Sequence, residues 1–213
     1  MTDGANIRGR PFKAKPMPAG GKVRPLAKGR GNDQSPPSTV WEGEAARWYD
    51  SLVGAGGSEF HRDLLIPSVI RLLELKAEEK LLDLACGQGV FCRAVSRLGV
   101  QVTGLDASRE LIQWAKKRSR SNIRYLVGDA THLEELQGEK YDAITCILGI
   151  QNIDPMEPVL HGCADLLRPG GRLVLVMTHP CFRVPRQSGW GWDEQRKLAY
   201  RRLDRYLTPL KAP

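Results

Sequence analysis

The sequence predicts an α/β fold in which a mostly parallel sheet lies between layers of helices. Five short apolar segments alternate with helical segments between residues 80 and 180, and strands that alternate with helices in this way form parallel sheets. A loop of small residues directly follows the first of these segments. Acidic residues recur at the ends of the first three, at Asp83, Asp106 and Asp129. A length of 213 residues suits one domain with a sizeable core.

The first predicted strand, residues 81–84, leads into the loop A-C-G-Q-G at residues 85–89. The two glycines of this loop allow a ligand to approach the backbone, because no Cβ stands in the way. The phosphate-binding pattern G-x-G-x-x-G does not fit here, because Val90 occupies its last position. A helix is predicted over residues 90–98, and Gly99 ends it.

The second strand, residues 100–106, ends about 20 residues beyond the loop, which is the distance at which a β-α-β unit returns the next strand end to the same ligand. A carboxylate at Asp106 can accept hydrogen bonds from both hydroxyls of a ribose. Ser108 is the predicted N-cap of a helix over residues 108–118. The third strand, residues 123–129, again ends in an acid.

The fourth and fifth strands are predicted at residues 141–148 and 166–177, and the fifth opens with a Pro-Gly-Gly turn. Before the sheet, helices are predicted at residues 44–52 and 63–76, with a glycine-rich break between them. The second of these helices is expected to pack on the core through Leu72, Leu73 and Leu75.

The order of these segments resembles the class I S-adenosylmethionine-dependent methyltransferases, over about residues 80 to 180. The sequence D-x-A-x-G-x-G at residues 83–89 resembles their motif I, residues 141–148 resemble their F-D-x-V strand, and residues 167–171 give their L-x-P-G-G turn. The resemblance implies a Rossmann-like three-layer αβα sandwich with sheet order 3-2-1-4-5. It implies S-adenosylmethionine as cofactor and a small-molecule methyl acceptor.

The resemblance also implies which residues meet the cofactor. Asp83 is expected to orient the loop and the methionine amino group, Asp106 to hold the ribose hydroxyls, and Asp129 to meet the adenine. Taken singly, each of these acids is more simply explained as a carboxylate that caps the turn after its strand, but three of them at these spacings favour a cofactor site. Tyr49 is expected at the methionine end, or else packs on the edge of the sheet. The full set of expected cofactor-binding residues is Tyr49, Asp83, Ala85, Cys86, Gly87, Gly89, Asp106, Ala107, Asp129, Ala130, Cys146 and Ile147.

On the acceptor side, His179 follows the fifth strand and is the candidate catalytic residue, as a base or an acceptor-orienting group. The alternative is that it hydrogen-bonds the loop turned by Pro180. Gln151 and Asn152, after the fourth strand, can orient a polar substrate but are poor bases. No metal site is expected, because the five cysteines form no C-x-x-C pair.

Both ends of the chain are basic, with net charges of +6 over residues 1–40 and +5 over residues 181–213. The first is expected to be a disordered Gly/Pro-rich tail, either solubilising or an RNA tether. The methyltransferase domain is expected at residues 41–180. Residues 181–213 are expected to be a basic aromatic lid or cap segment with a loop at 186–194 and a helix at 196–207. The last two strands of the fold are expected to be absent, either because this fold stops early or, as we favour, because the chain is truncated.

The cysteines are expected to be reduced, which favours a cytoplasmic location. No apolar segment is long enough to span a membrane. An RNA methyltransferase guided by the basic ends is less favoured, because no N-P-P-Y-like tetrapeptide follows the fourth strand. An inactive cofactor-binding partner subunit is a further alternative, and the sequence gives no basis for an oligomeric state.

Overall fold

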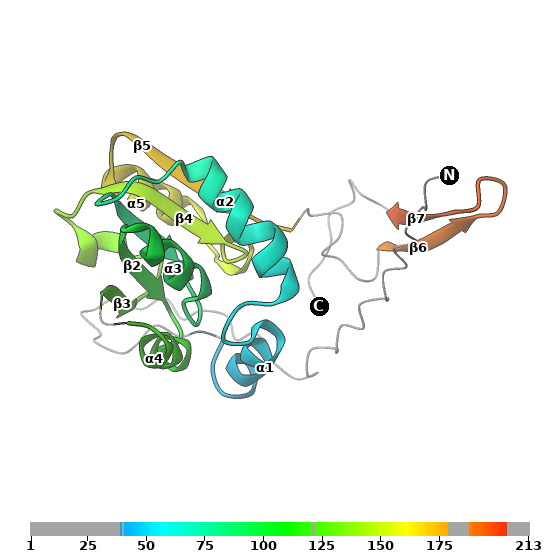
Figure 1. Ribbon diagram of the computed structural model, residues 1–213, viewed down its shortest axis with the longest axis horizontal. Coiled ribbons are helices and arrows are strands. Elements are labelled where there is room, and N and C mark those ends of the chain that lie inside the picture. The colour runs from blue at the N-terminus through cyan, green and yellow to red at the C-terminus, as the bar shows by residue number, and fades with distance from the viewer. Residues whose placement is uncertain (1–38, 40, 121, 179–187, 204–213) are drawn as a thin grey trace, which may run out of the picture.

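The computed structural model describes residues 39, 41–120, 122–178 and 188–203. Of the tail predicted for residues 1–40, only Thr39 belongs to the described residues. A five-stranded sheet has the order β3-β2-β1-β4-β5, and all of its neighbouring strands are parallel, as predicted. Figure 1 shows this sheet with helices in front of it and behind it. Its strands are β1 (Lys80–Leu84), β2 (Gln101–Asp106), β3 (Ile123–Val127), β4 (Tyr141–Ile147) and β5 (Leu167–Val176).

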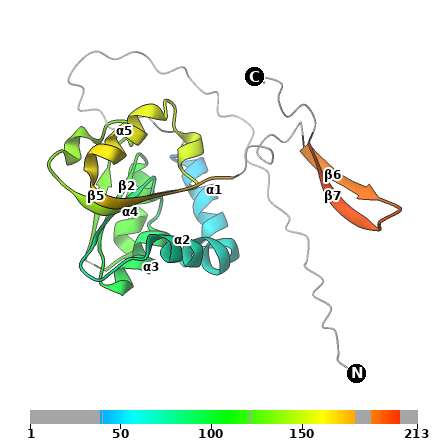
Figure 2. The same cartoon turned by 90° about the horizontal axis from the view of Figure 1, so that it is seen from above.

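Two hydrophobic cores lie on opposite faces of the sheet, because alternate residues of each strand point to opposite sides. On one face, Leu81 packs with α2 (Ile66–Leu73), α3 (Val90–Val95) and α4 (Arg109–Arg118). On the other face, Leu82 packs with α5 (Glu157–Leu166) and the 3₁₀ turn η3 (Leu133–Leu136). Figure 2 shows α5 on one side of β5, and α2 and α3 on the other side. The fold is therefore a three-layer αβα sandwich.

The helices after β1 and β2 follow the prediction closely. The helix α3 continues as the 3₁₀ turn η2 (Ser96–Leu98) and ends at Gly99, whose φ is +78°. The α4 helix is capped by Ser108, whose Oγ accepts a hydrogen bond from the backbone N–H of Leu111 at 3.1 Å. These local signals were sufficient because each cap lies within three residues of the helix end that it satisfies.

The helix predicted at residues 63–76 differs in the structure. It begins earlier, at Glu59, passes through a π-helical turn, η1 (His61–Leu65), continues as α2, and ends at Glu74 in a left-handed conformation. Leu73 is fully buried, but Leu72 is 62% exposed, so its expected packing role was wrong. Val69 and Leu73, four residues apart, occupy the buried face, and Leu72 points away from it.

The predictions of a loop at 186–194 and a helix at 196–207 were wrong over the described residues. Strands β6 (Ser188–Asp193) and β7 (Leu198–Leu203) form an antiparallel hairpin, a separate two-stranded sheet visible in Figure 1. The Tyr200 ring lies over Gly191, where a Cβ would meet its Cε2 at 2.7 Å. An aromatic ring that packs over a glycine of the neighbouring strand is a contact typical of paired strands. The apolar residues of this short segment have helical spacing, but so short a pattern does not exclude a strand. Neither strand extends the five-stranded sheet.

Candidate active site

A cavity of about 840 Å³ opens at the carboxyl edge of the sheet, where open α/β sheets bind their ligands. Two groups of residues line it. We call the lining residues between 39 and 64 the N-terminal wall, and those between 85 and 154 the sheet-side wall. The N-terminal wall consists of Thr39, Trp41, Tyr49, Leu52, Val53, Ser58, Glu59, Phe60, His61, Asp63 and Leu64. The sheet-side wall consists of Ala85, Gly87, Leu105, Asp106, Ala107, Leu111, Gly128, Asp129, Ala130, Thr131, Ile147, Leu148, Gly149, Asn152, Ile153 and Asp154.

The loop after β1 requires glycine at two positions for different reasons. Gly87 has a φ of +56° and lines the cavity, and a Cβ there would lie 3.2 Å from the Tyr49 hydroxyl oxygen. Gly89 has a φ of +78°, and a Cβ there would collide with the Tyr125 hydroxyl and lie 3.1 Å from the Ala115 Cβ. Gly87 therefore keeps the cavity open, whereas Gly89 lets the loop pack against α4 and β3.

Asp106 joins this loop to the end of β2. Its Oδ2 accepts a hydrogen bond from the Gly87 backbone N–H at 2.7 Å, and its Oδ1 accepts one from the Ser108 N–H at 2.8 Å. Burial raises the pKa of the Asp106 carboxyl, since the side chain is only 8% exposed. Each carboxylate oxygen has two lone pairs, so Asp106 can still accept hydrogen bonds from a ligand in the cavity that it lines.

Asp83 lies beneath the loop and outside the lining of the cavity. Its Oδ1 accepts a hydrogen bond from the Thr145 hydroxyl at 2.8 Å, and its Oδ2 one from the Cys92 thiol at 3.2 Å. Burial raises the pKa of Asp83 to about 7. These contacts tie β1 to β4 and α3, and the expected contact of Asp83 with the methionine amino group stays a prediction.

The other expected cofactor residues divide in the same way. Ala107, Ala130 and Ile147 line the cavity, whereas Cys86 and Cys146 lie outside its lining. Asp129 also lines it, and its Oδ1 accepts hydrogen bonds from the Thr131 N–H at 2.9 Å and the Thr131 hydroxyl at 2.8 Å. Asp129 therefore caps its own turn, and its Oδ2 lies 3.9 Å from the His132 Nδ1.

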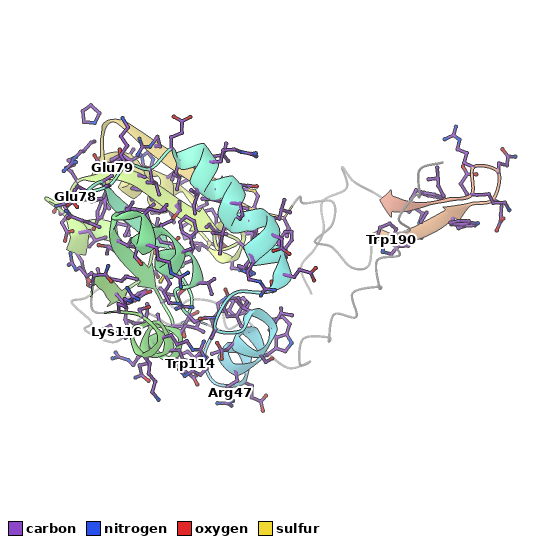
Figure 3. The ribbon with its side chains drawn as sticks, in the orientation of Figure 1. Arg47, Glu78, Glu79, Trp114, Lys116 and Trp190 are labelled. Carbon is purple, nitrogen blue, oxygen red and sulfur yellow. The ribbon has the colours of Figure 1, made fainter. Side chains whose placement is uncertain are left out.

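Tyr49 lies on α1 (Glu44–Val53), which covers one side of the cavity. Arg118 of α4 donates to both Asp50 oxygens, at 2.5 and 2.8 Å, and so fixes α1 against the core. Figure 3 shows Arg47 and Trp114 on these two neighbouring helices. Burial is the main cause that raises the pKa of Tyr49, so its hydroxyl is a neutral phenol beside Gly87.

The loop after α1 is held by side chains of the loop after β1 and of α3. Gln88, which is 1% exposed, donates from Nε2 to the Gly54 carbonyl at 2.5 Å. Arg93 of α3 donates to the Ala55 carbonyl at 2.7 Å and to the Gln88 Oε1 at 2.9 Å. Gln88 stands between the two glycines of the loop, so the loop that contributes Ala85 and Gly87 to one wall also holds the segment that leads to the other.

The residues that η1 and its preceding turn place in the N-terminal wall were not predicted from the sequence. His61 is one of them, and its Nδ1 lies 2.8 Å from the Ser58 hydroxyl oxygen. Burial lowers the pKa of His61. A histidine shortly after a glycine-rich break was the available signal, but nothing local predicts a π turn or the cavity that it faces.

The acceptor-side candidates of the sequence analysis are only partly described. His179 lies outside the described residues. Asn152 lines the cavity, whereas the Gln151 Oε1 accepts hydrogen bonds from the Thr178 N–H at 3.0 Å and the Thr178 hydroxyl at 2.8 Å. Gln151 therefore ties the segment after β4 to the end of β5.

Within the described residues, no group of three or more His, Cys, Asp and Glu side chains is arranged to hold a metal ion. No helix among those residues is both long and apolar enough to cross a membrane.

A family model described as "Methyltransferase domain" matches residues 82–175, which include β2 to β4, most of β1 and β5, and the whole sheet-side wall. Residues 82–175 thus form a domain of the class I S-adenosylmethionine-dependent methyltransferase type. S-adenosylmethionine is its cofactor. The site suits this ligand, because a cavity of about 840 Å³ is large enough to hold S-adenosylmethionine. Glycine at position 87 also keeps the cavity open, since a Cβ there would narrow the space beside Tyr49.

Several curated methyltransferases are similar to this chain in sequence. "Ubiquinone biosynthesis O-methyltransferase" of Xanthomonas axonopodis pv. citri is 31% identical over 62% of this chain and 56% of its own length. The protein of that name from Saccharophagus degradans is 32% identical over 60% of this chain and 55% of its own length. The chain thus spans about half the length of these relatives.

Solved structures support the same fold. An S-adenosylmethionine-dependent methyltransferase from Mesorhizobium loti is 25% identical, with a TM-score of 0.61 over 72% of this chain and 68% of that one. The PH0226 protein from Pyrococcus horikoshii OT3 has a TM-score of 0.59 at 23% identity, over 76% of this chain and 84% of that one. The latter likeness concerns the fold alone.

Proposed function

We propose that this methyltransferase transfers a methyl group from S-adenosylmethionine to a hydroxyl group of a small, largely apolar molecule. The observation that carries the proposal is that one cavity has two unlike walls. The sheet-side wall offers carboxylates and a glycine loop, and the N-terminal wall offers large apolar side chains. A bound cofactor and an acceptor can therefore meet in one space.

Four groups of the sheet-side wall would hold the cofactor. Asp106 would accept hydrogen bonds from the ribose hydroxyls, and Asp129 with Ala130 would lie at the adenine edge. Gly87 would admit the methionine part between the loop and Tyr49, where a Cβ would lie 3.2 Å from the Tyr49 hydroxyl. These roles are supported by the places of these residues in the lining.

The bound cofactor supplies a methyl group on a positively charged sulfur, which is already activated for transfer. The protein has to hold the acceptor oxygen in line with that methyl group and keep water away. Helix α1 and η1 suit this task, because their side chains form a wall of the cavity. The ties from Gln88, Arg93 and Arg118 hold this wall in place.

A hydroxyl acceptor is supported by the relatives named "Ubiquinone biosynthesis O-methyltransferase". Those proteins share only about half of their length with this chain, so the acceptor is inferred from the printed name together with the wall. Phe60 and Leu64 are 50% and 53% exposed and line the cavity, which suits a molecule with an apolar body.

We also infer a cytoplasmic location. It is supported by Cys86, Cys92, Cys146 and Cys163, which are free thiols in the described part of the chain.

A methyl-transfer assay tests the proposal. The purified chain is incubated with S-adenosylmethionine and either a panel of small hydroxyl compounds or total RNA, and the S-adenosylhomocysteine formed is measured. We expect turnover with the small compounds and none with RNA. Turnover with RNA alone would show that the acceptor is a nucleic acid, and a chain that binds the cofactor but serves no acceptor would be an inactive partner subunit.

A further inference from the structure

The π turn η1 interrupts a helical segment that runs from Glu59 to Leu73. A π turn widens a helix by one residue, and such turns occur frequently at functional sites. Here the turn lies against the cavity, and Leu65 from its last position is buried in the protein. Phe60, His61 and Leu64 line the cavity. The backbone departs from a regular helix at the point where these side chains face a ligand.

His61 is held in one position by its neighbours. Its Nδ1 lies 2.8 Å from the Ser58 hydroxyl oxygen, which leaves Nε2 as the ring nitrogen for a bound acceptor. A Cβ on Gly57 would lie 3.0 Å from the His61 Cβ, so the turn packs closely against the histidine. Arg62 donates a hydrogen bond to the Gly57 carbonyl and secures the same turn.

The surroundings keep the His61 imidazole in the form that accepts a proton. Burial lowers its pKa from the ordinary value of 6.5, so the ring is neutral near pH 7. Within its own segment the neighbouring charged side chains are Glu59, Arg62 and Asp63. Those of the sheet-side wall that line the same cavity are Asp106, Asp129 and Asp154. A ring that becomes charged during a reaction would thus find carboxylates around the same cavity.

The side chains beside His61 are apolar and exposed. Phe60 is 50%, Leu64 53% and Leu52 42% exposed, and all three line the cavity. Three large apolar side chains gathered at one wall indicate a ligand surface. The molecule that covers them brings an apolar body next to a neutral imidazole.

We propose that His61 is the general base for a phenolic acceptor whose apolar body lies on Phe60, Leu64 and Leu52. This inference rests on the proposed function. The acceptor O–H bond breaks, and its proton moves to Nε2 of His61. An oxygen electron pair forms the new bond to the methyl carbon, the carbon–sulfur bond breaks, and its electron pair stays on sulfur as a neutral thioether. His61 then releases the proton to water.

The phenol class follows from the strength of the base. An imidazole with an ordinary pKa of about 6.5 is matched to a hydroxyl with a pKa of about 10 far better than to an aliphatic alcohol. The proton can move as the oxygen attacks, because the hydroxyl becomes much more acidic when its oxygen begins to bond to the methyl carbon.

The test compares His61→Gln with His161→Gln, since His161 is exposed on α5 and lies outside the cavity lining. The two acceptors are 4-hexylphenol and 4-hexylcyclohexanol, which share a shape but differ in hydroxyl acidity. Calorimetry with S-adenosylhomocysteine accompanies the rate measurements. We expect the wild type to methylate the phenol only, and His61→Gln to lower kcat by about 100-fold with S-adenosylhomocysteine affinity unchanged within about twofold.

The pH profile distinguishes a base from a residue that only supports the fold. The wild-type rate should rise with pH and level off above the pKa of His61, because the neutral ring is the active form. The His61→Gln rate should instead keep rising toward the pKa of the phenol, and His161→Gln should behave as the wild type.

Three results would overturn the inference: a His61→Gln rate within about threefold of the wild type, equal use of the cyclohexanol, or a wild type that binds S-adenosylhomocysteine yet transfers no methyl group to the phenol. A wild type that does not bind S-adenosylhomocysteine would instead refute the proposed function.

Discussion

The two walls of the cavity are built by different physical means. The sheet-side wall comes from the ends of adjacent parallel strands, and its polar groups are satisfied close by, as when Asp106 accepts from Gly87 and Ser108. The N-terminal wall is attached to the core by side-chain hydrogen bonds from distant residues, with Gln88, Arg93 and Arg118 as donors. The first wall therefore depends on the buried core, and the second on a few polar ties that span 34 to 68 residues.

This difference suits two roles. A wall rooted in the sheet can present fixed groups to a cofactor of constant shape. In a wall that is joined by separate hydrogen bonds, the lining residues can be substituted without disturbing the sheet. The following predictions, from the largest expected effect to the smallest, test whether the two walls are separable in this way.

The largest effect concerns the buried carboxyl beneath the sheet-side wall. The folded-state pKa of Asp83 is about 7 against an ordinary 3.8, so folding retains a proton that the unfolded chain releases between these values. Asp83 therefore costs stability as pH rises from about 4 to about 7, by up to about 4 kcal/mol.

In Asp83→Asn this cost is absent, and the Asn oxygen can still accept from Thr145. Denaturant unfolding at a series of pH values measures the difference in the free energy of unfolding between this variant and the wild type. The variant should gain stability over the wild type as pH rises through this window, whereas a constant difference would mean that Asp83 is ionised in the folded protein.

The next effect concerns the packing of the glycine loop. Gly89→Ala places a Cβ against Tyr125 and Ala115 at a φ of +78°, and should cost about 3 kcal/mol from strain and overpacking together. Gly138→Ala is the control, because its φ is +91° but no atom lies within 4 Å of the added Cβ. It should cost about 1 kcal/mol. Equal losses in urea unfolding would show that the backbone conformation, and not the contact with Tyr125, requires glycine.

The joint between the walls is tested by Gln88→Ala. The substitution removes a donor to Gly54 and an acceptor for Arg93, and should lower the free energy of unfolding by about 2 kcal/mol. Hydrogen exchange should rise over residues 44–64 and stay unchanged in β1. Gln113→Ala, on the exposed side of α4, should change neither quantity. Faster exchange throughout the sheet would contradict the separation of the two walls.

The sequence predicted the sheet-side wall far better than the N-terminal wall. Ser108 and Gly99 could be placed from neighbouring residues, because caps act within a turn. The place of His61 could not, because it depends on a π turn, and because the loop before that turn is held at Gly54 by Gln88, which lies 34 residues further along the chain. The β6–β7 hairpin was missed for a similar reason, since the packing of Tyr200 over Gly191 is a contact between strands.

The central claim is that the sheet-side wall holds S-adenosylmethionine through Asp106, and calorimetric titration with S-adenosylhomocysteine tests it most directly. The wild type should bind, and Asp106→Ala should lose about 10- to 100-fold in affinity, because charged hydrogen bonds to the ribose and the anchor of Gly87 are lost together. Glu135→Ala, an exposed carboxylate outside the cavity lining, should bind as the wild type does, with all three chains folded by circular dichroism. Wild-type affinity in a folded Asp106→Ala chain would contradict the account.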